Sequence, residues 1–279
     1  MSKIIENVGL QGVICGLDDK PKKTSSCLSC PLDVCDIPSM RSRLAGIFKT
    51  YENEYHVTDA IGPPLITKFK RENPYYVYPD SLMPMFIGTA VHEKIEAENW
   101  EGESPEEKLI REKLGEGWHE VRGEYQLGPY KLVGTMDYVN RSKKLILDYK
   151  CLGAWKTRQL LDKAANNGDD EYFHQLNVYR AAFYPEAETL RLHVFLKDFS
   201  GNAQRMYKLD RQEYRVNVPI YDKEAALEKV RANIEQSRLP EPRSCTKEET
   251  WNGLRCKKFC PAYTCFLYEG PSYNPEDVE

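Results

Sequence analysis

The sequence predicts an α/β fold with a mixed central sheet flanked by helices, and a cysteine-rich segment on either side of this core. Segments with helical periodicity and segments with strand alternation follow one another as helix, three strands, helix and strand along the 279-residue chain. Eight of the nine cysteines lie in two groups, one before and one after these segments. We therefore expect a cysteine-rich N-terminal appendage at 1–50, a core at 51–240 and a C-terminal cysteine cluster at 241–279.

Helical periodicity appears at the start of the expected core, between its strands and at its end. Ser104, with Glu107 three residues later, has the spacing of a capping box and marks the start of one helix. The last helix ends before Pro240, because proline cannot continue a helix. The expected helices lie at 56–73, where a proline turn divides two of them, and at 85–99, 104–115, 171–184 and 222–238.

Strand alternation appears in three consecutive segments and again later in the chain. The first three are separated only by the turn-like sequences GPY and NRSK, so we expect them to form an antiparallel meander. The fourth follows a helix, which makes a mixed sheet. The expected strands lie at 119–127, 130–140, 143–150 and 190–199.

Three side chains on these strands form a candidate catalytic site. Side chains alternate across a strand, so Asp148 and Lys150 share one face, about 6.5 Å apart. Asp137 lies on the preceding strand and can converge with Asp148, since adjacent antiparallel strands lie about 4.8 Å apart. A lone Asp-x-Lys is most often a solvated strand edge. Here the triplet ends an apolar run and follows a Gly-x-x-Asp strand, which favours a site.

Two carboxylates and a lysine suit the hydrolysis of a phosphodiester bond. The reaction needs a nucleophilic water near neutral pH and compensation of the charge that develops on the phosphate, and a divalent metal ion supplies both. Mg²⁺ or Mn²⁺ is the expected ion because such ions accept oxygen ligands and retain waters. Lys150 would orient or deprotonate the attacking water and stabilise the developing charge.

These motifs resemble those of the RecB-like and Cas4-like exonucleases of the PD-(D/E)xK superfamily. The likeness runs through GTAVHEKIE, GTMDYV, LILDYK, HQLNVYR and the terminal cysteines, in that order, over roughly residues 55 to 270. The resemblance implies a restriction-endonuclease-like core in which His92 is a metal ligand together with Asp137 and Asp148. It also implies that Gln175 and Tyr179 line the site and contact DNA.

Helical spacing agrees with the roles that this resemblance implies. His92 and Glu96 are one helical turn apart, and so are Gln175 and Tyr179, so each pair projects from one face of its helix. A structural histidine, and simple packing of Gln175 and Tyr179, remain the alternatives. Glu124, on the first strand, is a weaker candidate for assisting the metal ion, and a surface position is the simpler interpretation.

The late cysteines are Cys245, Cys256, Cys260 and Cys265, whose short spacings allow one loop to surround a metal. Related Cas4-like and AddB-like nucleases hold a [4Fe-4S] cluster with one early and three late cysteines. This sequence departs from that pattern, because Gly62, Pro63 and Pro64 stand where the early cysteine is expected. Cys245 can supply the fourth ligand instead. Four thiolates suit either Zn²⁺ or an iron–sulfur cluster, and the resemblance favours [4Fe-4S].

The early cysteines predict a possible second metal site, for which a zinc knuckle is the first interpretation. Three thiols within nine residues are uncommon by chance, although a loop with free thiols and a contribution to the late cluster remain alternatives. Cys151, which follows Lys150, is expected to be a small buried apolar residue. The early group consists of Cys15, Cys27, Cys30 and Cys35.

Composition sets the broader class of protein. With 29% charged and 41% hydrophobic residues the chain is expected to fold as a globular protein. A net charge of −4 argues against indiscriminate coating of nucleic acid but leaves room for a local basic groove. No apolar run of about 20 residues is present, so we expect a cytoplasmic protein without a membrane partner, encoded by a cell, a virus or a mobile element.

The predicted function is a metal-dependent deoxyribonuclease, with DNA as its substrate and an exonuclease role in recombination, repair or CRISPR adaptation. A helicase or a recombination or adaptation protein is the expected partner. The alternative is a non-catalytic DNA-binding or scaffold module that retains the nuclease fold. A zinc-based adaptor is a third reading, in which the carboxylates on the strands would have no task.

Overall fold

The computed structural model describes residues 4–5, 8–15, 20–23, 25–26, 50–77, 88, 90, 117–258, 260–262 and 265. The chain divides into two compact units. The terminal unit takes Met1–Tyr55, Gly62–Phe86 and Arg231–Glu279, and the sheet unit takes His56–Ile61 and Ile87–Val230. Of the described helices, none has both the length and the apolar character needed to cross a membrane.

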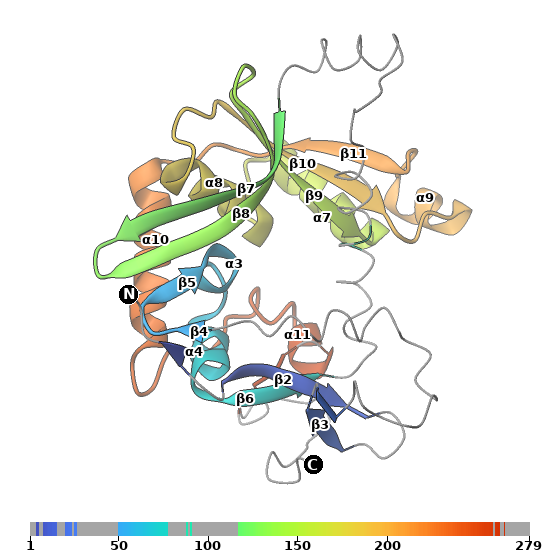
Figure 1. Ribbon diagram of the computed structural model, residues 1–279. Coiled ribbons are helices and arrows are strands. Elements are labelled where there is room, and N and C mark those ends of the chain that lie inside the picture. The colour runs from blue at the N-terminus through green and yellow to red at the C-terminus, as the bar shows by residue number, and fades with distance from the viewer. Residues whose placement is uncertain are drawn as a thin grey trace. The chain divides into compact units, whose positions relative to one another are not determined.

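The sheet unit is built on the mixed sheet that the sequence predicts. Its strands follow the order β11-β10-β9-β8, and β7 also pairs with β8 (Figure 1). Strands β9 and β10 are parallel, while the pairs β7–β8, β8–β9 and β10–β11 are antiparallel. The strands are β7 (Gly117–Leu127), β8 (Tyr130–Asn140), β9 (Leu145–Leu152), β10 (Thr189–Leu196) and β11 (Glu213–Asn217).

The register of the β7–β8 hairpin is set by its two-residue turn. Gly128 has a φ of 60°, and proline fixes a negative φ at Pro129, which together suit a type II′ turn. Leu127 therefore lies opposite Tyr130, and the pairing continues without a shift to Gly117 and Asn140. This long hairpin carries the first acidic side chains of the candidate site.

Helices connect β9 to the parallel strand β10 and cover the sheet. Helix α8 packs against β7, β8, β9 and β10, and α7 packs against β10 and β11. The core between them is apolar, with Ile146, Leu160, Phe173, Leu176 and Leu192 all at 0% exposure. The helices with residues in this unit are α3 (Val57–Ala60), α7 (Ala154–Ala165), α8 (Glu171–Ala182), α9 (Gly201–Tyr207) and α10 (Lys223–Ser237), the last spanning the boundary between the units.

Three elements of this unit, α7, α9 and β11, are absent from the sequence-based prediction. The N-cap position of α7 is Gly153, which has no capping side chain, and Asp198 Oδ1 accepts the free N–H of Ala154 at 2.7 Å. A cap supplied from 44 residues away leaves no local signal. Strand β11 is short and carries one buried residue, Val216, so its alternation is also weak.

The terminal unit contains a small sheet of order β3-β2-β6. Its central strand, β2, lies in the stretch that the sequence predicted as a metal-stapled or flexible appendage. It pairs in parallel with β6, about sixty positions further along, which a local pattern cannot indicate. The elements are β1 (Ile4–Ile5), β2 (Gly9–Ile14), β3 (Pro21–Lys23), β4 (Thr50–Tyr51), α4 (Pro64–Glu72), β6 (Pro74–Val77) and α11 (Leu254–Lys258), with β5 (Glu54–His56) at the boundary between the units.

Candidate active site and cysteine segment

Strands β8 and β9 separate at the two predicted catalytic aspartates. Their ladder holds from Asn140 to Tyr138, which lies opposite Leu147, and the recorded pairing ends there. The next pair in this register would be Asp137 and Asp148. Past the end of the ladder, Asp137 Oδ2 accepts the backbone N–H of Tyr149 at 2.8 Å. The carboxylate of Asp137 thus takes the place of a ladder hydrogen bond, and the two aspartates flank the opening between the strands.

Asp148 and Lys150 form an ion pair along β9. Lys150 Nζ lies 2.5 Å from Asp148 Oδ2, and the two side chains share a face as strand alternation predicts. Asp148 is only 1% exposed, and a buried carboxylate costs several kcal/mol unless a cation accompanies it. Burial lowers the pKa of Lys150, but the negative charges of Asp148, Asp137 and Glu171 outweigh burial and hold that pKa above its ordinary value. Lys150 is therefore a cation at neutral pH.

Helix α8 brings Gln175 and Tyr179 to the same place. Gln175 Nε2 donates to the Tyr179 hydroxyl at 2.9 Å, and both side chains are buried. Burial, followed by the negative charges of Asp148 and Asp137, raises the pKa of Tyr179 well above its ordinary value. The phenol is thus neutral at neutral pH and lies within electrostatic reach of both carboxylates.

Gly134 explains why β8 and α8 can approach so closely. A Cβ atom at Gly134 would lie 2.9 Å from Tyr179 Cε1 and 3.2 Å from Phe183 Cε2, closer than such atoms normally come. The glycine of the GTMD sequence therefore makes room for the Tyr179 ring. Its role is steric, and it links the strand motif to the helix motif.

Glu120 is a functional candidate that the sequence analysis missed. It faces Asp137 in the β7–β8 register, between the pairs His119–Tyr138 and Val121–Met136. Its φ is 50°, a conformation that costs an ordinary residue roughly 1–2 kcal/mol and often occurs at functional sites. The charge of Glu120 also contributes to the raised pKa of Tyr179. Counting back from the Gly128–Pro129 turn would have placed Glu120 opposite Asp137.

Glu124, by contrast, is a surface residue, as its simpler interpretation proposed. Its carboxylate lies 2.8 Å from Lys131 Nζ and 3.3 Å from Arg122 Nη2. Hydrogen bonding to Lys131 lowers the pKa of Glu124. This carboxylate is committed to exposed ion pairs on the hairpin.

Several predicted site residues lie outside the described residues. They are His92, Glu96, Cys27, Cys30 and Cys35. Cys15, the remaining member of the early group, is half-buried after β2, and its backbone N–H donates to Lys20 O at 2.8 Å. The possible second metal site therefore stays a prediction. Cys151 is half-buried rather than fully buried, and burial raises its pKa.

The four late cysteines lie close enough to influence one another. Burial, then Glu249 and the other three late cysteines, raise the pKa of Cys245 to about 12. Burial also raises the pKa of Cys260, and the charges of Cys256 and Cys265 add to the effect. The charges of Cys256 and Cys265 thus act on both Cys245 and Cys260, a setting in which a bound cation would stabilise thiolates.

Local hydrogen bonds shape the segment that carries these cysteines. Thr246 and Glu249 form a reciprocal pair, in which each backbone N–H donates to the side chain of the other residue, at 2.7 and 3.2 Å. Arg243 holds the same carboxylate through two hydrogen bonds, of 2.7 and 2.8 Å. The backbone N–H groups of Cys260 and Cys265 donate to Arg255 O and Ala262 O.

The side chains at the aspartate site and at the late cysteines are of the types that bind metal ions, although neither group is arranged as a complete set of ligands. Within the part of the chain that the structure describes, no three His, Cys, Asp or Glu side chains are grouped as they would be around a metal ion. The carboxylate oxygens of Asp137 and Asp148 suit Mg²⁺ or Mn²⁺, and the thiols suit zinc or iron. The effects of the other late cysteines on the pKa of Cys245 and Cys260 indicate that these thiols are near one another, which is a weaker statement than coordination.

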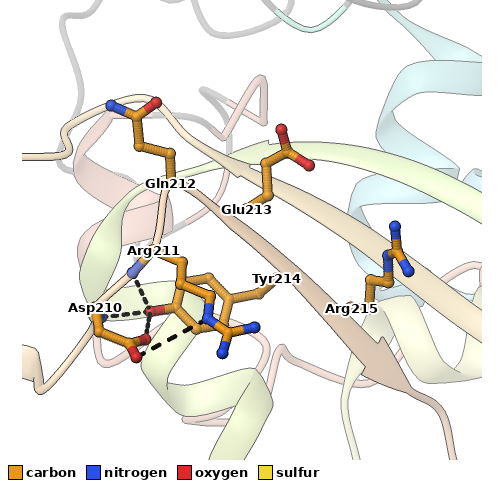
Figure 2. Close-up of a pocket in the computed structure, with 6 residues that line it drawn as sticks. All are labelled: Asp210, Arg211, Gln212, Glu213, Tyr214 and Arg215. Atoms are coloured by element: carbon orange, nitrogen blue, oxygen red, sulfur yellow. Dashed lines mark hydrogen bonds and ion pairs between the residues drawn. The ribbon is translucent and has the colours of Figure 1, made fainter.

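A pocket at the start of β11 lies apart from these residues. It encloses about 640 Å³ and is lined by Asp210, Arg211, Gln212, Glu213, Tyr214 and Arg215. Figure 2 shows the Tyr214 hydroxyl accepting the N–H groups of Asp210 and Arg211, at 2.7 and 2.9 Å, and donating to Asp210 Oδ1 at 3.0 Å. These bonds close a turn, and the pocket includes none of the predicted site residues.

Proteins of known structure that are similar to this chain are distant from it in sequence. No family model and no curated protein matches the sequence. The crystal structure of SSO0001 is similar over 81% of this chain and 92% of that one, at 18% identity and a TM-score of 0.48. A phage-related exonuclease from Haemophilus somnus 129PT is similar over 53% and 69%, at 12% identity and a TM-score of 0.31. An alkaline exonuclease from Laribacter hongkongensis is similar over 66% and 88%, at 10% identity and a TM-score of 0.40. At these values the likenesses decide nothing about the site, whose chemistry follows from its own side chains.

Proposed function

We propose that this protein is a metal-dependent nuclease that hydrolyses phosphodiester bonds in DNA. One observation supports the proposal above the others. Asp137, Asp148 and Lys150 meet where β8 and β9 separate, and Tyr179, hydrogen-bonded to Gln175, lies close enough for both carboxylates to raise its pKa. Two acids, a cation and two neutral polar groups at an opening in a sheet have no structural task that requires all five.

Asp137 and Asp148 would hold the divalent metal ion, with Glu120 and the predicted ligand His92 as further donors. When bound, the ion would lower the pKa of a water and compensate the charge on the phosphate. In the present geometry Lys150 Nζ forms an ion pair with Asp148, and the Tyr149 N–H donates to Asp137. These contacts hold the two acidic side chains in place.

Lys150 then acts as a cation rather than as a base. Because neighbouring carboxylates raise its pKa, its ammonium group can donate hydrogen bonds to the attacking water or to a phosphate oxygen. The neutral Tyr179 hydroxyl accepts a hydrogen bond from Gln175 and keeps its own proton, which it would donate to a phosphate oxygen. Both groups would position the substrate by hydrogen bonds.

The finer assignments are part of the same proposal. We assign the activity to an exonuclease of recombination, repair or CRISPR adaptation, acting with a helicase or another recombination or adaptation protein. The four late cysteines would hold a [4Fe-4S] cluster, or Zn²⁺ as the alternative. Support for that cofactor comes from the effects of the neighbouring thiols on the pKa of Cys245 and Cys260 and from the resemblance of the sequence.

A cleavage assay on end-labelled DNA tests the nuclease proposal. The wild-type protein is expected to cleave with Mg²⁺ or Mn²⁺ and to lose activity in EDTA. Asp148→Asn and Lys150→Met should each lower the rate by about 10³-fold, the size expected when one charge-stabilising group is lost. Manganese binding followed by calorimetry should weaken in Asp148→Asn. Lys144→Met, which breaks an exposed ion pair with Glu188, is the matched control and should cleave normally.

The competing functions give different outcomes in this assay. DNA binding without cleavage under any divalent metal would identify a non-catalytic binding or scaffold module. Wild-type rates in both Asp148→Asn and Lys150→Met would remove the site from the mechanism. Release of zinc with no effect on DNA would favour the adaptor.

A further inference from the structure

Two lysines on α7 converge on a single carboxylate. Lys156 Nζ and Lys163 Nζ each lie 2.8 Å from the same oxygen, Asp170 Oδ2. They are seven residues apart and therefore lie on the same face of the helix, two turns from each other. Asp170 is also the N-cap of α8, where its other oxygen accepts the N–H of Tyr172 at 3.2 Å. Lys156 and Lys163 are called the lysine pair below.

The lysine pair carries more positive charge than its carboxylate needs. The Asp170 side chain is 2% exposed, so it needs a cation, and one lysine would be enough. The second lysine therefore leaves an excess positive charge. Because both ammonium groups contact the same oxygen, they are no farther apart than twice the ion-pair distance. Their side chains are 22% and 39% exposed, which leaves them accessible from solvent. An anion beside them would relieve the repulsion between two like charges.

The Tyr172 ring joins the lysine pair to the candidate active site. Lys150 Nζ lies 5.3 Å from the centre of this ring, and Lys156 Nζ lies 5.2 Å from it. Exposure of the lysine side chains rises from 19% at Lys150, through 22% at Lys156, to 39% at Lys163. Through Tyr172 and Asp170 the three cations thus form a connected row, whose far member from the active site, Lys163, is the most exposed.

The start of α7 does not add to the positive charge of this region. Helix N-termini attract anions through free N–H groups, but the Ala154 N–H already donates to Asp198 Oδ1 at 2.7 Å. A phosphate at that end would meet the negative charge of Asp198. The positive charge of this region is therefore carried by the lysine side chains rather than by the helix end.

We propose that the lysine pair binds the phosphate backbone of the substrate strand next to the bond that is cleaved. Ammonium groups are point charges that contact phosphates without reading bases, so this contact would be independent of sequence. The row would guide one strand toward Lys150. This inference deepens the proposed nuclease function and rests on it, but it concerns the binding step alone.

Two variants with opposite expected effects test the proposal. Asp170→Asn keeps a good N-cap and removes the negative charge, so the lysine pair should bind nucleic acid more tightly. The triple variant Lys156→Gln, Lys163→Gln, Asp170→Asn keeps the same cap with neutral side chains and should bind more weakly. Binding of a labelled single-stranded DNA is measured in EDTA, where no cleavage occurs, over a range of KCl concentrations. The slope of log K against log salt should become shallower by roughly 1.4 in the triple variant, about 0.7 for each lost phosphate contact.

The control and the outcomes keep this test separate from the test of cleavage. Lys144→Gln removes one exposed cation elsewhere in the sheet unit and should leave the slope unchanged. Unchanged or weaker binding by Asp170→Asn overturns the inference, and so does an unchanged slope in a folded triple variant. If the triple variant fails to fold, the direction of the Asp170→Asn effect decides the question. Failure of the wild-type protein to cleave DNA counts against the nuclease proposal, whatever the slopes show.

Discussion

The carboxylate site and the late cysteine segment differ in what holds their side chains. Asp137 and Asp148 lie on strands that also carry fully buried apolar residues, such as Ile146 at 0% exposure. Cys256 lies in the short helix α11, and the other late cysteines lie outside helices and strands. The buried residues that the structure describes in this segment are Thr250 and Ala262. Strands position the first site before any ligand arrives. The second segment has little apolar burial to offset the roughly 1–2 kcal/mol of backbone entropy lost per ordered residue, so we expect it to depend on the proposed metal.

The largest effect expected from this difference is a loss of stability in the cysteine segment. Cys256→Ser, Cys260→Ser and Cys265→Ser should each release the bound metal or cluster and lower the melting temperature by roughly 10 °C, because the free energy of metal binding is also folding free energy there. Metal analysis, the visible absorption spectrum and thermal melting measure these effects. A brown protein indicates iron–sulfur, and a colourless protein with stoichiometric zinc indicates the alternative.

Cys151→Ser is the matched control for these variants, because Cys151 is half-buried on β9 in the sheet unit. It should retain the metal and melt close to the parent protein. If all three late variants keep full stability and the parent contains no metal, the segment is held by its turns alone. The contrast between the two regions would then disappear.

At the carboxylate site, substitution of Glu120 should have a smaller effect, which falls on cleavage rather than on stability. Glu120→Gln and Glu120→Gly should each slow DNA cleavage by roughly 10- to 100-fold, since both remove a charge opposite Asp137. Glu120→Gly should melt no lower than the wild type, because glycine adopts a φ of 50° without strain. Steady-state cleavage rates and melting curves are the measurements. Normal rates in both variants would make the backbone conformation at Glu120 incidental to catalysis.

The smallest of these effects concerns the contact between β8 and α8. Gly134→Ala places a methyl group against the Tyr179 ring, so cleavage should fall by about 10-fold through displaced tyrosine, with a stability cost of about 1–3 kcal/mol. Gly201→Ala is the control, because a Cβ there meets nothing within 4 Å. Cleavage kinetics at saturating metal and melting curves of both variants make the comparison. Equal rates in the two variants would mean that the Tyr179 position does not matter.

Much of the sheet unit could be predicted because its signals are local. Strand alternation located β8 with the boundaries that the structure shows, and it placed Asp148 and Lys150 on one face. Helical spacing put Gln175 and Tyr179 together, where they are hydrogen-bonded. In each case the periodicity of one element determines which side chains are neighbours, and that periodicity is written in consecutive residues.

Other features were decided by residues far apart in the sequence, and only the tertiary structure shows them. The cap that Asp198 gives α7 and the pairing of β2 with β6 join segments that are distant along the chain. The separation of β8 from β9 at Asp137 is set by packing between elements. Glu120 was hidden in the same way, since its importance depends on the register with a second strand. A sequence pattern reports the period of one element, whereas register and pairing depend on the contacts that two elements make when they fold together.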